Sequence, residues 1–185
     1  VFPEGAEVKV LRASQIILDE GIARPILLGS EEAILSTIKS LELDLTGVEI
    51  IDPTRSPKLE AYADAYVEAL YRLAALQQTQ LAAPSKAIEG YRVTLERAPS
   101  YEPARQALEG LITAGLEAEA AMSVLNEHLR AQGDLSRLAT ALRSLLQVTE
   151  ERARAAELWR ELGVLLSEGL SDDVEAIEAY SEALR

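Results

Sequence analysis

The opening third of the chain alternates between short apolar runs and longer segments whose apolar residues recur every three or four positions. The short runs, at residues 1–2, 25–28 and 48–51, predict strands. The segments between them, at residues 6–20 and 31–41, predict helices with one apolar face. This order predicts an open parallel sheet of three strands joined by right-handed helical crossovers.

From about residue 66 the pattern changes to helices alone. Nothing after Asp52 resembles a strand, and Pro, Gly, Ser and Asp residues divide the remainder into segments of helical length. The predicted helices lie near residues 57–82, 84–98, 102–114, 117–132, 134–148, 151–169 and 172–184. We therefore predict an α/β unit at residues 1–70 and an all-α unit at residues 66–185, which share the helix that begins near Pro57.

Two segments of the helical region resemble each other. Leu158-Trp159-Arg160 matches Leu70-Tyr71-Arg72, and Ala176-Ile177-Glu178 matches Ala87-Ile88-Glu89. The second copy stops with the chain, and several helices separate the two copies. Self-similarity of this kind is typical of helical repeat proteins, in which each unit buries its apolar face against the next.

The composition supports packed helices and excludes several chemistries. Aromatic residues make up only 4% of the chain, which disfavours a β-sandwich. The net charge of −13 argues against binding to nucleic acid or to an anionic membrane surface. The chain has no cysteine and one histidine, His128, which excludes thiolate chemistry and sites that need two imidazoles. Neither a membrane-spanning run nor a signal peptide is visible, so we expect a cytoplasmic protein.

Four segments of the opening region carry a family resemblance, at residues 1–5, 10–13, 21–29 and 48–53. In this order they resemble the opening of the phosphate acetyltransferase domain, which also forms the C-terminal part of NADP-dependent malic enzymes. The resemblance covers residues 1–70 and implies the start of a much longer α/β domain. In that family, acetyl transfer between coenzyme A and phosphate depends on segments further along, in a cleft between two lobes. No such segment follows here, so we assign no catalytic, cofactor-binding or metal-binding residue.

The helical region resembles a tetratricopeptide repeat within each copy of its internal repeat. Residues 159–166 (Trp-x-x-Leu-Gly-x-x-Leu) are similar to the first helix of that family, and residues 176–184 to the second. The resemblance implies stacked helix pairs, in which small residues such as Gly163 and Ala75 allow close approach and Tyr180 fills the next interface. The three middle helices fit the family pattern poorly.

The junction between the two units has no flexible linker. The helix that begins near Pro57 runs through Tyr71 without a Gly, Pro or Ser break. A helix is stiff over this length, so it would fix the orientation of both units. Natural fusions usually carry a flexible linker at such a boundary, and we therefore favour an engineered chimera over a natural chain.

The predicted sheet has a face that its own helices leave open. Successive crossovers in one direction place their helices on the same face. The unbroken apolar run at residues 25–28 predicts burial on both faces, as in parallel sheets. Either the repeat helices or a second chain would have to cover the other face, which makes it a candidate for self-association.

Most individual candidate residues have structural explanations. Ser30 is expected to cap the helix that begins at Glu31, and acidic residues in that first turn would repel an anion. Asp172 and Asp173 are expected to cap the last helix, and His128 to be a solvated or capping histidine. We assign Trp159 to the core and the charged run at residues 150–152 to solvated helix surface. There is no P-loop or G-x-G-x-x-G sequence.

Three functions compete on this evidence. The prediction that we favour is a non-catalytic, engineered or chimeric scaffold without cofactors. The alternative is a tetratricopeptide-like interaction module that binds a peptide or protein in its helical groove, and the net charge would favour a basic partner. Aligned Asn, Lys or Arg residues in the groove would support that alternative, but the inner positions show few. The third function, an acyltransferase fragment that binds acetyl-CoA or phosphate, conflicts with the absence of the downstream segments.

Overall fold

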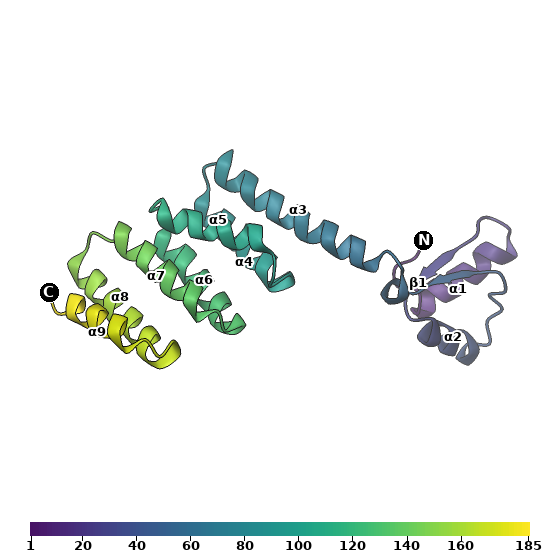
Figure 1. Ribbon diagram of the computed structural model, residues 1–185. Coiled ribbons are helices and arrows are strands. Elements are labelled where there is room, and N and C mark those ends of the chain that lie inside the picture. Colours follow the sequence, from purple (N-terminus) through teal and green to yellow (C-terminus); the bar gives the residue numbers. More distant parts are fainter. The chain divides into compact units, whose positions relative to one another are not determined.

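The computed structural model covers residues 1–185 and contains nine α-helices and a two-stranded parallel sheet (Figure 1). The chain forms two compact units, Val1–Asp64 and Ala65–Arg185, and each is described by itself. The boundary falls within helix α3 (Leu59–Thr79). No helix combines the length and the apolar character that crossing a membrane would require.

The first unit is a minimal α/β fold. Its elements are α1 (Val8–Asp19), β1 (Ile26–Leu28), α2 (Glu31–Ser40), β2 (Glu49–Ile51) and a short 3-10 helix, η1 (Pro53–Arg55). The two strands run parallel, with Leu27 opposite Ile50. The alternation that we predicted from the apolar pattern is therefore present, with helix bounds within two residues of those expected.

The predicted third strand is reduced to a single bridge between Phe2 and Leu27. The Phe2 N–H donates to the Ile26 carbonyl at 2.8 Å, and the Phe2 carbonyl accepts from the Leu28 N–H at 2.9 Å. The next residue, Pro3, fixes its φ angle and carries no N–H. The Leu28 carbonyl then accepts from the Gly5 N–H rather than from Glu4, so the ladder does not continue. The prediction of a three-stranded sheet was wrong for this reason.

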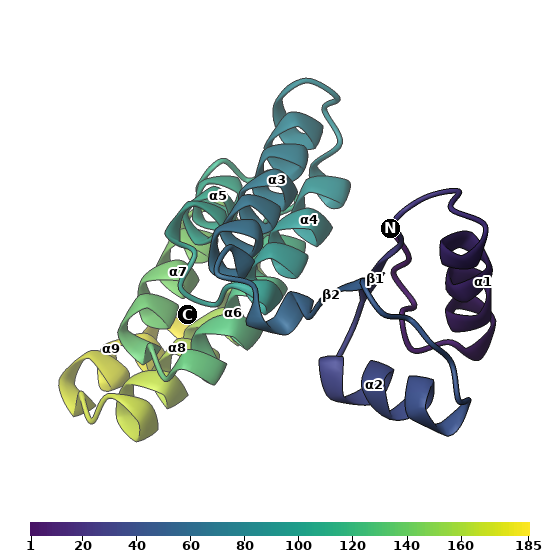
Figure 2. The same ribbon diagram turned by 90° about the vertical axis from the view of Figure 1, so that its right-hand side faces the viewer.

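One face of the strand pair forms the core of the first unit. Leu27 is fully buried against Leu11 of α1 and Ile34 of α2, so both helices lie on the same face (Figure 2). This is the result expected when both crossovers run in one direction. The neighbours of Leu27 in the strand, Ile26 and Leu28, are only half-buried. The unit's own helices therefore leave the other face of the strand pair open, as the direction of the crossovers predicted.

The second unit is built from antiparallel helices that follow one another in space as in sequence (Figures 1 and 2). After α3 come α4 (Pro84–Arg97), α5 (Glu102–Thr113), α6 (Ala118–Gln132), α7 (Leu135–Val148), α8 (Arg152–Val164) and α9 (Asp173–Ala183). A π-helical turn, Leu165–Gly169, extends α8. The predicted segments match these helices closely, because α3, α4, α5 and α6 are each followed within a few residues by Gly or Pro.

Two ion pairs link alternate helices of this unit at the same sequence spacing. Arg137 of α7 donates to Glu102 of α5 at 3.1 Å, and Arg154 of α8 donates to Glu119 of α6 at 2.8 Å. Each pair joins residues 35 positions apart. The helices α4, α6 and α8 accordingly begin at evenly spaced positions along the chain. Our comparison of the two similar sequence segments did not detect this shorter spacing between alternate helices.

Small residues bring two helix pairs into close contact. A Cβ atom on Gly163 would lie 2.7 Å from the ring of Tyr180, which confirms the expected role of that glycine. A Cβ atom on Gly90 would lie 2.6 Å from the Cβ of Ala74. The prediction named Ala75 as the small residue of α3, and it was wrong by one position, because Ala74 is the buried residue that faces α4.

We predict that Gly90→Ala destabilises the helical unit. The added methyl group would overlap Ala74, and overpacking of this kind costs about 1–3 kcal/mol. The matched control is Gly110→Ala on α5, where nothing lies within 4 Å and the helix gains about 1 kcal/mol of propensity. Urea unfolding followed by circular dichroism measures both. An increase in stability for Gly90→Ala equal to that of the control would contradict the close contact.

Candidate functional site

The carboxyl ends of the parallel strands form the candidate site of the first unit. Residues 3–5 follow the Phe2 bridge, Gly29 and Ser30 follow β1, and residues 52–54 follow β2. The parallel direction of the strands brings these three turns to one edge of the sheet. Open α/β sheets bind their ligands at this edge, which is why it is the first place to look for chemistry.

Backbone contacts hold the middle turn of this edge in place. The Gly29 N–H donates to the Ile51 carbonyl at 3.1 Å, and Gly29 has a φ of 145°, a conformation that favours glycine. The Ser30 side chain then accepts from the Ala33 N–H at 3.4 Å and caps α2, as predicted. Glu31 and Glu32 occupy the first turn of α2, so the positive end of the helix dipole already has negative partners.

Close packing restricts the first turn at this edge. A Cβ atom on Gly5 would lie 2.6 Å from the Leu28 carbonyl oxygen and 2.9 Å from the Cδ1 of Ile34. Only glycine fits between the strand backbone and α2 at this distance. The position of the turn at residues 3–5 therefore depends on Gly5.

Asp52 is the one acidic residue of the edge that is held in a defined orientation. Its carboxylate accepts from the Thr54 N–H at 2.9 Å and from the Thr54 hydroxyl at 2.7 Å, with Arg55 3.7 Å away. These hydrogen bonds from Thr54, more than the charge of Arg55, hold the pKa of Asp52 below its usual value. Asp52 is therefore an ionised, oriented carboxylate near neutral pH and not a proton donor.

The edge presents these groups without enclosing them. Ligand crevices in open sheets form where the strand order reverses. Here Phe2, β1 and β2 follow one another in a single direction, so no reversal occurs within the unit. No group of three or more His, Cys, Asp or Glu side chains in the structure has an arrangement that would hold a metal ion.

The second unit contains a polar cavity between α5 and α7. Its volume is about 360 Å³, and its walls carry Glu102, Glu109 and Arg137 beside hydroxyl-bearing residues of α7. Arg137 is already paired with Glu102, so the charge left free in this cavity is acidic. No cluster of catalytic side chains lies in it.

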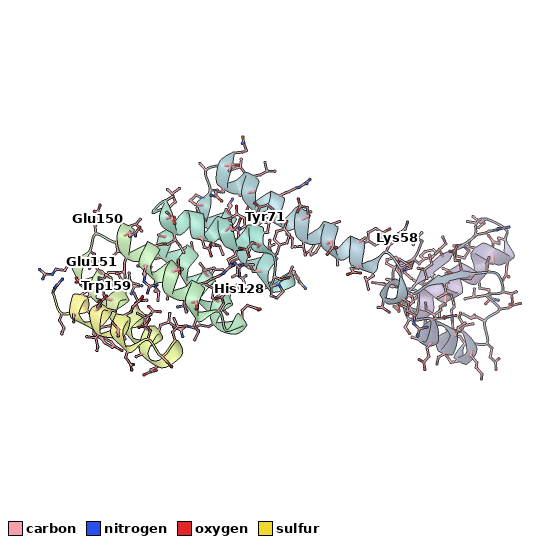
Figure 3. All side chains as sticks on the ribbon, viewed as in Figure 1. Lys58, Tyr71, His128, Glu150, Glu151 and Trp159 are labelled. Atoms are coloured by element: carbon pink, nitrogen blue, oxygen red, sulfur yellow. The ribbon has the colours of Figure 1, made fainter.

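His128 lines a cavity between α4 and α6 (Figure 3). Its side chain is half-buried, and its ring Nε2 is buried without a hydrogen-bond partner. Burial lowers the pKa of His128 below 6.5, and the nearby charge of Arg105 lowers it further, against a hydrogen bond to the Pro99 backbone. The predicted solvated histidine is thus only half-exposed, because this position of α6 faces Leu95 and Pro99.

The other candidates from the sequence have the structural roles that we expected. Asp172 accepts from the Glu175 N–H at 3.1 Å and caps α9. Trp159 packs against the core of the helical unit. Glu150 and Glu151 are exposed at the turn before α8 (Figure 3).

A cluster of three tyrosines is a feature that the sequence analysis did not identify. The ring centroid of Tyr71 lies 5.9 Å from that of Tyr91 and 5.5 Å from that of Tyr101. The Tyr91 hydroxyl donates to Gln78 at 2.7 Å, and the Tyr101 hydroxyl donates to Glu68. Burial raises the pKa of Tyr91 and of Tyr101 to about 12, so both remain protonated and serve the packing of α3, α4 and α5.

Comparison with known proteins identifies relatives of the opening region. Residues 1–85 match the family model described as phosphate acetyl/butaryl transferase. The chain is 46% identical over 68 residues to the phosphate acetyltransferase of Nitratidesulfovibrio vulgaris, covering 37% of this chain and 10% of the relative. It is 44% identical over 68 residues to that of Thermoanaerobacterium thermosaccharolyticum, covering 37% and 20%. The NAD-dependent malic enzyme of Rhizobium meliloti is 32% identical over 81 residues, covering 42% and 10%.

The resemblance that we stated for the opening region is thereby confirmed. The chain spans only a tenth to a fifth of the length of these relatives. The family match extends to residue 85 and so includes all of α3, although the compact units divide at residue 64. No solved structure matches the chain.

The comparisons overturn our functional prediction. The relatives are named phosphate acetyltransferase, which is an enzyme, so a non-catalytic engineered scaffold was the wrong prediction. The interaction module that we gave as the alternative is not supported either. The assignments as a designed chimera and as a tetratricopeptide protein have no support from these comparisons. The missing linker misled the prediction, because the region matched by the family model continues through α3.

We predict that Thr54→Val raises the pKa of Asp52 toward its ordinary value of 3.8. The substitution removes the hydroxyl that contributes most to the lowered pKa. A carboxylate with a lowered pKa stabilises the fold above its ordinary pKa, and this stability is lost as the pH falls through the folded value. Carboxyl-carbon NMR titration measures the shift. Thr46→Val is the control, because Thr46 bonds Asp44 in the same way, and it should leave Asp52 unchanged.

We predict that His128 makes the helical unit less stable in mild acid. Because the folded pKa is lowered, the unfolded chain takes up the proton first as the pH falls below about 6.5. The urea midpoint should therefore decrease between pH 7.5 and 5.5, and His128→Leu should abolish most of that decrease. An equal decrease in the variant would contradict the assignment of this pH dependence to His128.

Proposed function

We propose that this chain acts in acyl transfer of the phosphate acetyltransferase type, with residues 1–85 as the opening part of the acyltransferase domain. The observation that carries the proposal is the family match over these residues, together with identities of 44–46% to enzymes of that name. Acetyl transfer from coenzyme A to phosphate breaks the thioester bond and forms an acetyl–phosphate bond, and it releases the coenzyme A thiol.

The geometry of the first unit suggests which part of this task it performs. Its strand pair carries three turns at one edge, and Gly5 and Gly29 fix two of them by close packing and by backbone geometry. Such turns are suited to contacting a substrate through backbone groups. The unit's contribution is therefore the framework of one wall of a substrate crevice.

The charges at this edge limit what else the unit contributes. Glu4, Glu31 and Glu32 are exposed there, and Arg55 is the cation nearest to Asp52. A phosphate group needs positive charge or free helix N–H groups, and those of α2 are already compensated by Glu31 and Glu32. In this proposal, the cations that bind phosphate come from residues beyond the first unit.

A segment exchange tests the proposal. The 68-residue segment of the Thermoanaerobacterium relative that matches this chain is replaced by the matching segment of this chain, and phosphate-dependent release of coenzyme A from acetyl-CoA is measured. We expect the hybrid to retain activity within about tenfold of the parent, since substitutions away from the reacting groups cost little transition-state stabilisation. The chain has no cysteine, so the exchanged segment adds no background to a thiol assay.

A single substitution in the hybrid provides the control. Gly5→Val places a side chain against the Leu28 carbonyl and should remove activity by displacing the turn at the sheet edge. A hybrid with a native circular dichroism spectrum but no phosphate-dependent release would contradict the proposal.

A further inference from the structure

Helix α3 carries an apolar surface on the side away from the helical core. Val67 and Ala74 are buried within the unit. Tyr66, Leu73 and Leu76 are each more than half exposed, although all three are large and apolar. Single exposed apolar residues are normal on a protein surface, whereas a contiguous row of them marks an interaction site.

The spacing of the exposed residues identifies the shape of the occupant. Tyr66, Ala69, Leu73 and Leu76, which we call the α3 seam, are all exposed and lie three, four and three positions apart. An alternation of three and four is the pattern of a helix that winds around another helix. In the sequence, the same alternation continues back through Tyr62. The surface therefore fits a second helix rather than a loop or a sheet.

The charges beside the seam do not oppose a second copy of this chain. The chain has a net charge of −13, so two copies repel one another over most of their surface. In the coiled-coil register of the seam, the flanking positions are held by Ala65, Leu70, Arg72 and Gln77, and none of them is acidic. The acidic Glu68 lies outside these positions and pairs with Arg72 at 2.7 Å. Like-charge repulsion between carboxylates is therefore absent where the two seams would meet.

The sizes of the seam residues favour one orientation. In an antiparallel pair, Tyr66 lies opposite Leu76 of the other copy, and Leu73 lies opposite Ala69. Each layer then combines side chains that fill the space evenly. A parallel pair would place Ala69 against Ala69 and leave a void in the middle of the contact.

We propose that the α3 seam forms an antiparallel helix pair with the α3 seam of a second copy, as a two-fold symmetric dimer. Such an interface is self-complementary, because every contact between two different positions occurs twice, once from each copy. This inference rests on the exposure, spacing and charge of α3 alone, and it does not depend on the proposed acyl transfer.

Sedimentation velocity of the full chain tests the proposal. We expect a concentration-dependent dimer at up to about 100 μM. In Leu73→Lys/Leu76→Lys we expect the dissociation constant of this dimer to increase by about 100-fold or more. The matched control is Val174→Lys/Ile177→Lys, which changes the charge equally at two exposed residues of α9 with the same spacing. Circular dichroism verifies that both variants fold. A wild-type chain that remains monomeric, or a dimer that both variants weaken equally, overturns the proposal.

Disulfide trapping tests the orientation. The chain has no cysteine, so each introduced thiol is unique. Oxidation of an equal mixture of Ala69→Cys and Leu73→Cys should yield mainly the mixed covalent dimer, which mass spectrometry distinguishes from either homodimer. Efficient crosslinking of Ala69→Cys with itself overturns the antiparallel arrangement.

Discussion

The handedness of the connections in the first unit determines most of what that unit offers. Two successive crossovers in the same direction place α1 and α2 on one face of the strand pair, where Leu11, Leu27 and Ile34 form the core. The same constraint leaves Ile26 and Leu28 half-buried on the other face. Because both crossovers run in one direction, the strand order does not reverse within the unit, and the turns at the sheet edge are ordered without an enclosing crevice. A substrate site at this edge needs further structure against it.

The second unit depends instead on how closely its helices approach. At Gly90 and Gly163 there is no room for a side chain, and large residues such as Tyr91 fill the adjoining space. The ion pairs from Arg137 and Arg154 lie at partly exposed positions and contribute little stability individually. The packing of small against large side chains, more than the charges, therefore holds successive helices in register.

Much of the fold was predictable because it is encoded locally. Most helix ends coincide with Gly, Pro, Ser and Asp signals, and the caps at Ser30 and Asp172 act as their sequence context indicates. What was not predictable depends on contacts between distant residues. The strand at Phe2 fails because of where Gly5 meets Leu28, and the half-buried state of His128 depends on which face of α6 meets α4. The orientation of Asp52 by Thr54 involves neighbours and was visible in principle as an Asp-x-Thr turn.

Because of the distribution of its aromatic side chains, unfolding of different parts of the helical unit can be followed separately by optical spectroscopy. Its tryptophan, Trp159, lies in α8, whereas Tyr71, Tyr91 and Tyr101 cluster where α3, α4 and α5 meet. Indole fluorescence therefore reports on the C-terminal helices, and the near-ultraviolet signal of the tyrosines reports on the N-terminal ones. Because each helix contacts mainly its sequence neighbours, the two signals distinguish a chain that melts as one cooperative block from one that frays inward from an end.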